Sequence, residues 1–251
     1  VVMTGTHPEY YSLQMLDAVQ GFVDRGGRLM YLGGNGFYWR ISFSDKHPGV
    51  IECRRSEAGI RPWEPGPGQF HHAFTGEYGG LWRRNGRPST ELTGLIMSSQ
   101  GFDISSPYEL TNAAKDPRVG FMFEGIDTTP GRKFGDFGLS GGGAAGLEID
   151  RADYNLGTPP HAMIVASSKF HTDIYLMTPE DMLDPTPDMS GTQNDTIRAD
   201  LVFFETAHGG AVFSTGSIAW AGAMAWNNYD NEVSRLMRNV LTRFNKAGPL
   251  S

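Results

Sequence analysis

The residues best suited to chemistry lie in two short segments, 5–11 and 33–39. Tyr10 and Tyr11 close the first segment, and Tyr38 lies near the end of the second. A phenol ring is most often a half-buried aromatic whose hydroxyl reaches water, and spacing alone does not separate that packing role from a functional one. Convergence of both segments on one edge of a sheet would favour a functional site.

The elements around these segments have the pattern of a βαβ unit. Residues 1–4 form a short apolar strand, and Ser12 is suited to cap a helix that ends at Gly26-Gly27. The helix carries its apolar side chains on one face: Leu16, Val19, Phe22 and Val23. A buried strand follows over 28–32. Each tyrosine segment directly follows a strand of this unit. Because parallel strands end at the same edge of a sheet, both segments are predicted to lie at that edge, where ligands bind.

The rest of the chain predicts one α/β domain over residues 1–251, with a mostly parallel sheet flanked by helices. Short apolar segments separated by turns, including 121–123, indicate β-hairpin and long-loop insertions between residues 41 and 200. Residues 201–204 and 211–214 form a hairpin pattern. A last helix places apolar residues at helical spacing from Val233 to Phe244. The chain begins in a strand without an initiator Met, so we expect it to be cut from a longer polypeptide.

Composition excludes several classes of function. The net charge of −7 and the lack of a basic stripe argue against nucleic-acid binding. One cysteine, Cys53, excludes an internal disulfide framework and any zinc site built from several thiolates. No apolar run approaches the roughly 20 residues of a membrane span. We expect a cytoplasmic protein that is not bound to a membrane.

Several motifs match chemical signatures without the context those signatures need. Residues 141–146 match the dinucleotide fingerprint and residues 138–142 the nucleophile elbow, but neither follows a strand and opens a helix. Cys53 lies in an alternating segment, which favours a buried structural thiol over a nucleophile. The His pairs lack the spacing of zinc ligands.

Longer stretches of sequence resemble a known family. They are HPEYY at 7–11, YLGGNGFYWR at 31–40, GEYGGLWR at 76–83, FEG at 123–125 and GGGAAGLEIDR at 141–151. Together with the closing helix they are similar to the C-terminal catalytic domain of the N,N-dimethylformamidase large (beta) subunit family. The resemblance covers essentially the whole chain.

The resemblance implies a glutamine-amidotransferase-like fold that has lost the amidotransferase cysteine. It also implies one mononuclear Fe(3+), held by two tyrosines and a glutamate. The corresponding ligands are Tyr10, Tyr38 and Glu124, with Glu77 and Glu148 as alternatives for the carboxylate. Tyr11 stands where the family motif has Trp, which leaves a second phenol beside Tyr10.

This ligand set suits the chemistry of amide hydrolysis. Phenolate and carboxylate are hard anionic donors that match a ferric ion. Such an ion polarises a carbonyl and lowers the pKa of bound water. A proton donor to the departing amine is also needed, for which Glu205, Asp150 and His7 are candidates. Asn35 is suited to donate a hydrogen bond to the developing oxyanion.

The expected activity is hydrolysis of a small N-substituted amide, such as N,N-dimethylformamide, to an acid and an amine. The resemblance further implies a small partner subunit and homo-oligomerisation. Two alternatives remain open from the sequence. One is a non-catalytic amidotransferase-like domain for binding or assembly, and the other is a sugar-processing enzyme on the same scaffold, since aromatic platforms also suit sugars.

Overall fold

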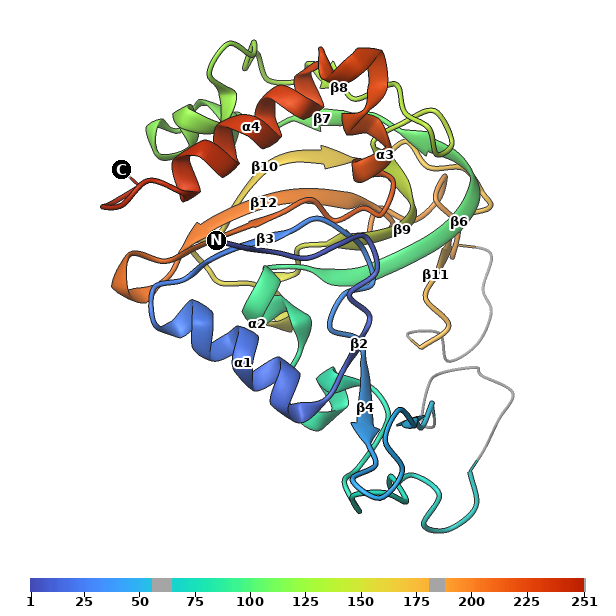
Figure 1. Cartoon of the computed structure of the whole chain (residues 1–251). Helices are drawn as coiled ribbons and strands as arrows, with labels where there is room; N and C mark the ends of the chain where they lie inside the picture. Colours follow the sequence, from blue (N-terminus) through green and yellow to red (C-terminus); the bar gives the residue numbers. More distant parts are fainter. Residues whose placement is uncertain (56–64, 181–187, 251) are drawn as a thin grey trace.

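A seven-stranded mixed sheet forms the centre of the molecule (Figure 1). The computed structural model describes residues 1–55, 65–180 and 188–250. The strand order is β1 (Val2–Met3), β3 (Arg28–Tyr31), β13 (Ala211–Ser214), β12 (Ala199–Glu205), β10 (Met163–Ser168), β7 (Tyr108–Leu110) and β8 (Lys133–Phe134). Parallel pairing joins β1 to β3 and β3 to β13, and the pairs from β13 to β8 are antiparallel. The predicted α/β class is confirmed, but the sheet is mixed rather than mostly parallel, since two of the six strand pairs described here are parallel.

Two three-stranded sheets complete the strand structure. One has the order β11 (Leu176–Met177), β6 (Ile96–Ser106) and β9 (Ala145–Arg151), and the other β2 (Tyr10–Tyr11), β4 (Trp39–Phe43) and β5 (Ile51–Cys53). Figure 1 shows β4 running away from the large sheet, so the chain leaves that sheet directly after β3. The loop between β3 and β4 therefore lies where the sheets approach one another.

Helices cover both faces of the large sheet (Figure 1). They are α1 (Leu13–Asp24), α2 (Ser89–Thr93), α3 (Trp220–Met224) and α4 (Glu232–Phe244). Side chains of α1 and α2 belong to one buried cluster with Leu29 and Val212, while those of α3 and α4 belong to another with Met30 and Phe213. Neighbouring residues on β3 and on β13 thus point into opposite cores, as the period of two in a strand requires.

The predicted N-terminal unit is confirmed. Val2 pairs with Leu29 in parallel register, and the Ser12 hydroxyl accepts a hydrogen bond from Met15 N at 3.3 Å to cap α1. The predicted hairpin is also confirmed as β12 and β13, and the last helix begins after its N-cap, Asn231. Local signals decide these elements, which is why the sequence predicts them well.

The segment 121–123 is helical, so the prediction of a strand there is wrong. Residues Pro117–Phe123 form a 3₁₀ helix, η3, and the Asp116 carboxylate caps it by accepting a hydrogen bond from Arg118 N at 2.9 Å. Proline at the first turn of a helix and an acidic cap before it favour this local structure over the apolar run. The other 3₁₀ helices are η1 (Trp82–Asn85), η2 (Asn112–Lys115), η4 (Tyr154–Leu156), η5 (Ala207–Gly209) and η6 (Trp226–Tyr229).

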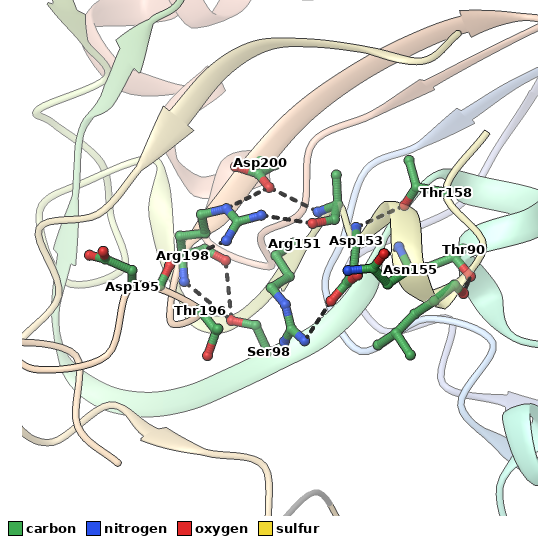
Figure 2. Close-up of polar contacts among 12 residues, drawn as sticks. Thr90, Ser98, Arg151, Asp153, Asn155, Thr158, Asp195, Thr196, Arg198 and Asp200 are labelled. Carbon is green, nitrogen blue, oxygen red and sulfur yellow. Dashed lines mark hydrogen bonds and ion pairs between the residues drawn. The ribbon is translucent and has the colours of Figure 1, made fainter. Parts of the chain in front are cut away.

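A charged network joins the large sheet to the sheet that contains β6 and β9 (Figure 2). Arg198 Nε donates to Asp200 Oδ2 at 2.9 Å, and Arg198 Nη2 donates to Ala152 O at 2.7 Å. The Asp200 side chain is fully buried and also accepts from Ala152 N at 2.8 Å. Because a buried carboxylate without partners is costly, these bonds fix the relative position of β12 and β9.

Arg28, the first residue of β3, holds the C-terminal segment against the sheet through hydrogen bonds. Its guanidinium donates to the carbonyl oxygens of Phe244, Lys246 and Gly248 at 3.0, 2.6 and 2.5 Å. Burial lowers the pKa of this group, and the nearby Arg243 lowers it further. The carbonyls at the end of α4 carry the negative end of the helix dipole, so they favour the cation. In the described part of the chain, no helix is both long and apolar enough to cross a membrane.

Arg28→Met is expected to lower the free energy of unfolding by about 2–3 kcal/mol, because it removes several charge-assisted hydrogen bonds to backbone carbonyls. Urea unfolding followed by circular dichroism measures the change. Arg84→Met, at an exposed position, is the matched control and should change stability by less than about 0.5 kcal/mol. Equal effects of the two substitutions would contradict the proposed role of Arg28.

Candidate metal centre at the junction of three sheets

A polar pocket of about 260 Å³ lies at the junction of the three sheets. Tyr38 lines it from the end of the β3–β4 loop, and the Tyr38 hydroxyl donates to Glu180 Oε2 at 3.0 Å. Both side chains are buried. The other lining residues come from the loops before β2 and β4, from β4, β6 and β9, and from positions just after β5 and β11. They are Glu9, Asn35, Trp39, Arg55, Met97, Gln100, Glu148 and Pro179.

The β3–β4 loop is held in an uncommon conformation by hydrogen bonds to Asp150. Asn35 and Phe37 have φ angles of 55° and 53°, in the left-handed region. Asn35 N donates to Asp150 Oδ1 at 2.8 Å, and the Tyr31 hydroxyl donates to Asp150 Oδ2 at 2.6 Å. The same hydroxyl accepts from Gly36 N at 2.7 Å. These bonds compensate for the strained backbone and fix where Asn35 and Tyr38 lie.

The glycines of this loop are required by close backbone contacts. A Cβ atom on Gly34 would lie 2.3 Å from the carbonyl oxygen of Glu148, and one on Gly36 would lie 2.6 Å from the Tyr31 hydroxyl. The loop is therefore pressed directly against β9. Only glycine allows this approach, which brings the loop and the Glu148 strand into one wall.

Burial raises the pKa of two carboxyls in this wall, Glu9 and Glu148. Burial raises the pKa of Glu9, although Arg55, the Asn35 amide and His7 oppose the shift. Burial also raises the pKa of Glu148, and the Glu9 carboxylate adds to that rise, while His7 and the Asn35 amide oppose it. The Glu9 carboxylate is 3.8 Å from Arg55, and Glu148 Oε2 is 3.5 Å from His7 Nδ1.

Comparisons with known proteins agree with this arrangement of motifs. Residues 1–231 match the family model described as N,N-dimethylformamidase beta subunit-like, C-terminal. The chain is 45% identical over 249 residues to the N,N-dimethylformamidase beta subunit of Paracoccus aminophilus and 43% identical to that of Alcaligenes sp.. Each match covers 99% of this chain and 32% of the relative. The chain belongs to the N,N-dimethylformamidase beta subunit-like, C-terminal family. It spans about a third of the length of these curated relatives.

The donor atoms around the pocket suit the hard cation that this dimethylformamidase family implies. Glu148 Oε2 and Asn35 Oδ1 are buried and have no hydrogen-bond partner among the described residues. The described residues contain no group of three or more His, Cys, Asp or Glu that is placed to hold a metal ion. A site here must therefore include other donors, and the described lining residues supply the Tyr38 phenol oxygen and the side-chain amide oxygens of Asn35 and Gln100. Phenol, carboxylate and amide oxygens fit a ferric ion.

The two tyrosines predicted from the family motif lie near each other but face different surroundings. Tyr10 is half-buried and packs against the cluster that contains Tyr38 and Trp39, with the Arg55 guanidinium 5.3 Å from its ring centre. Tyr10 does not belong to the pocket wall. The Tyr11 ring packs in a tilted geometry against Phe37, with ring centroids 4.5 Å apart, in a separate core cluster. Tyr11 is thus a packing residue, and Tyr38 is the phenol that lines the pocket.

Glu124, the predicted carboxylate ligand, lies outside the pocket wall. It follows η3, its side chain is exposed, and its carbonyl accepts a hydrogen bond from Asn239 of α4 at 3.0 Å. The segment that precedes it is not a strand and does not aim Glu124 at the sheet edge. Of the two alternatives, Glu77 is paired with Arg40 at 2.6 Å. Glu148 lines the pocket with Tyr38.

The three predicted proton donors lie in three different parts of the structure. Asp150 is buried beneath the β3–β4 loop and outside the pocket wall, and burial raises its pKa to about 7. Glu205 is the last residue of β12 and pairs with Ala211, which in turn pairs with the first residue of β3. It therefore lies at the opposite end of the strands from the β3–β4 loop. His7 is at the rim, with 55% of its side chain exposed, and reaches the pocket through Glu148.

Two carboxyls in the wall, Glu9 and Glu180, are absent from the residues predicted for the site. Glu9 had a signal, because it lies in the HPEYY segment beside Tyr10. Glu180 follows β11 by three residues, in an irregular segment with no recognisable motif. Cys53 is half-buried, and burial raises the pKa of its thiol to about 11, with a further contribution from Glu9. A thiol with that pKa stays protonated near neutral pH and is a poor nucleophile.

Gly34→Ala is expected to lower the free energy of unfolding by about 1–3 kcal/mol, because the new methyl group would overlap the Glu148 carbonyl. Thermal and urea unfolding measure the effect. Gly5→Ala is the control, since a Cβ at that position meets nothing within 4 Å. If the Gly34 variant is as stable as the wild type, the loop does not need the close approach described above.

Proposed function

We propose that this chain forms the catalytic part of an iron-dependent amide hydrolase. The reaction would convert a small N-substituted amide, such as N,N-dimethylformamide, to a carboxylic acid and an amine. The observation that carries the proposal is the pocket in which the Tyr38 hydroxyl contacts Glu180 and in which Glu148 forms part of the same wall. The names of the two relatives support the class of reaction.

The proposed ligands are the oxygens of Tyr38, Glu148 and Glu180. Tyr10 packs beside this group and is the family's second phenol by motif. An iron bound there would act as a Lewis acid on the amide carbonyl and would lower the pKa of a bound water. The anionic donors would remain deprotonated beside the cation, because its charge dominates the local field.

The other wall residues would orient the substrate and move protons. The Asn35 side chain is held by the strained loop, so its amide is preorganised to donate a hydrogen bond to the developing oxyanion. Glu9 is fixed through its backbone, because the Glu9 carbonyl accepts from Tyr38 N and Trp39 N at 2.9 and 3.0 Å. Its carboxyl is suited to take a proton from the attacking water and deliver it to the departing amine nitrogen.

A partner subunit is part of the proposal. The relatives are named beta subunits, and the chain spans 32% of their length. We therefore expect the complete enzyme to contain a second kind of subunit. We also expect its beta subunit to be longer than the 251 residues of this chain. Tests of activity should use that complete enzyme.

Tyr38→Phe is expected to remove most of the bound iron while the fold is kept, because the substitution deletes an anionic oxygen but retains the aromatic ring. Elemental analysis and the visible tyrosinate charge-transfer band measure the loss. Tyr229→Phe, at a ring that is 63% exposed, controls for phenol deletion. A colourless, metal-free wild type would instead favour a non-catalytic binding domain.

Glu148→Gln and Glu124→Gln form a matched pair that tests which carboxylate binds the metal. Glu148→Gln is expected to lose most of its iron, because the neutral amide is a much weaker ligand for a hard cation. Glu124→Gln should retain the wild-type iron content, since its side chain is exposed at the end of η3. The same elemental analysis decides between them. Iron loss in the Glu124 variant alone would restore that residue as the ligand.

A further inference from the structure

A second, apolar groove of about 290 Å³ lies along the ribbon formed by β6 and β11. These strands are antiparallel, with Leu176 opposite Gln100. Phe102, Ile174 and Leu176 line the groove and are 65%, 59% and 47% exposed. Large apolar side chains gathered at one exposed place usually mark a binding surface, since their contact with water is unfavourable.

The groove and the polar pocket are neighbours that share part of their lining. Gln100 and Pro179 line both, and the chain runs from β11 through Pro179 directly to Glu180. A molecule with its polar group beside Glu180 would therefore have an apolar surface next to it along the same ribbon. The two cavities differ in chemistry, because the polar pocket is lined mainly by carboxyl, amide and guanidinium groups.

N,N-dimethylformamide has five heavy atoms and would fit within the polar pocket alone. It gives no reason for an apolar extension of comparable size. Burial of each methylene group favours binding by about fourfold, so an apolar groove beside the reacting carbonyl discriminates strongly between short and long alkyl substituents.

We propose that the groove lined by Phe102, Ile174 and Leu176 binds the apolar substituents of the amide substrate, so that this enzyme prefers amides with N-alkyl or acyl groups longer than methyl. The inference rests on the proposed amide hydrolase activity and adds the substrate class. The amide carbonyl would lie in the polar pocket, and the alkyl chain would pass Gln100 and Pro179 into the groove.

The test compares the hydrolysis of N,N-dimethylformamide and N,N-dibutylformamide by the complete enzyme and its variants. Wild-type kcat/KM is expected to be higher for the dibutyl amide. Leu176→Ser should lower kcat/KM for the dibutyl amide by about tenfold, mainly through KM, and should change that for the dimethyl amide by less than twofold. Phe102→Ser is a second variant in case the first does not fold, and Leu139→Ser, at an exposed leucine outside the groove, is the matched control.

The outcomes separate the two proposals. Hydrolysis of neither amide by wild-type enzyme would count against the proposed function. Hydrolysis of the dimethyl amide, with no preference for the dibutyl amide or with equal effects of Leu176→Ser and Leu139→Ser, would overturn the substrate class and leave the activity standing. Loss of a co-purifying subunit in Leu176→Ser, with unchanged kinetics per assembled enzyme, would also overturn it, because a polypeptide would then occupy the groove.

Discussion

The buried carboxyl of Asp150 is the group on which the arrangement of the pocket depends. It lies on β9, and it accepts hydrogen bonds from the Tyr31 hydroxyl at the end of β3 and from Asn35 N in the loop that follows. A buried carboxyl is tolerated only when such partners are present, so a change in the loop would leave it unsatisfied. The same bonds hold Asn35 in the left-handed region, which a non-glycine residue rarely adopts. The hydrogen bonds that satisfy the buried Asp150 carboxyl therefore also hold the strained loop in place, and the loop in turn positions Tyr38.

The alternation of a strand explains why one short stretch of β9 supplies both the support and a wall of the pocket. Glu148 and Asp150 are two residues apart, so their side chains project from the same face of the strand. Glu148 reaches the pocket, whereas Asp150 lies deeper, beneath the glycine-rich loop. Gly34 allows the loop backbone to touch the Glu148 carbonyl, so the loop and the strand cannot move independently. Residues 33–36 (GGNG) and 147–150 (LEID) therefore pack together as one structural unit, although more than 100 residues separate them in the sequence.

Much of the local structure follows from the sequence, and long-range placement mostly does not. Ser12, the Gly26-Gly27 pair and the hairpin glycines predict their elements because capping and turn chemistry act over a few residues. Tyr38 was also predictable, since it directly follows a recognisable βαβ unit. Glu180 was not, because it reaches Tyr38 across 142 residues from an irregular segment. Glu124 shows the opposite error: an apolar run before a carboxylate resembles a strand end, but Asp116 and Pro117 begin a 3₁₀ helix there. Family motifs indicated the region, and the three-dimensional contacts show that Glu148 lines the pocket, whereas Glu77 pairs with Arg40 and Glu124 is exposed.

The charge balance of the pocket is unfavourable for the chain on its own. Glu9, Glu148 and Glu180 share one wall, in which Arg55 is the basic residue among the described lining residues, and Arg83 Nη2 donates to the Glu180 carbonyl at 3.3 Å. Burial raises the pKa of Glu9 and of Glu148, and repulsion from the Glu9 carboxylate raises the pKa of Glu148 further, so these carboxyls hold their protons more tightly than exposed ones. Such an arrangement does not help the protein fold, and Arg55 is partly engaged by the rings of Tyr10 and Trp39. A cation bound at the proposed ligands Tyr38, Glu148 and Glu180 would offset this imbalance, because its positive charge favours the ionised form of the carboxyls beside it. The same electrostatic cost would favour binding of a hard cation, which is the property that the proposed hydrolysis requires.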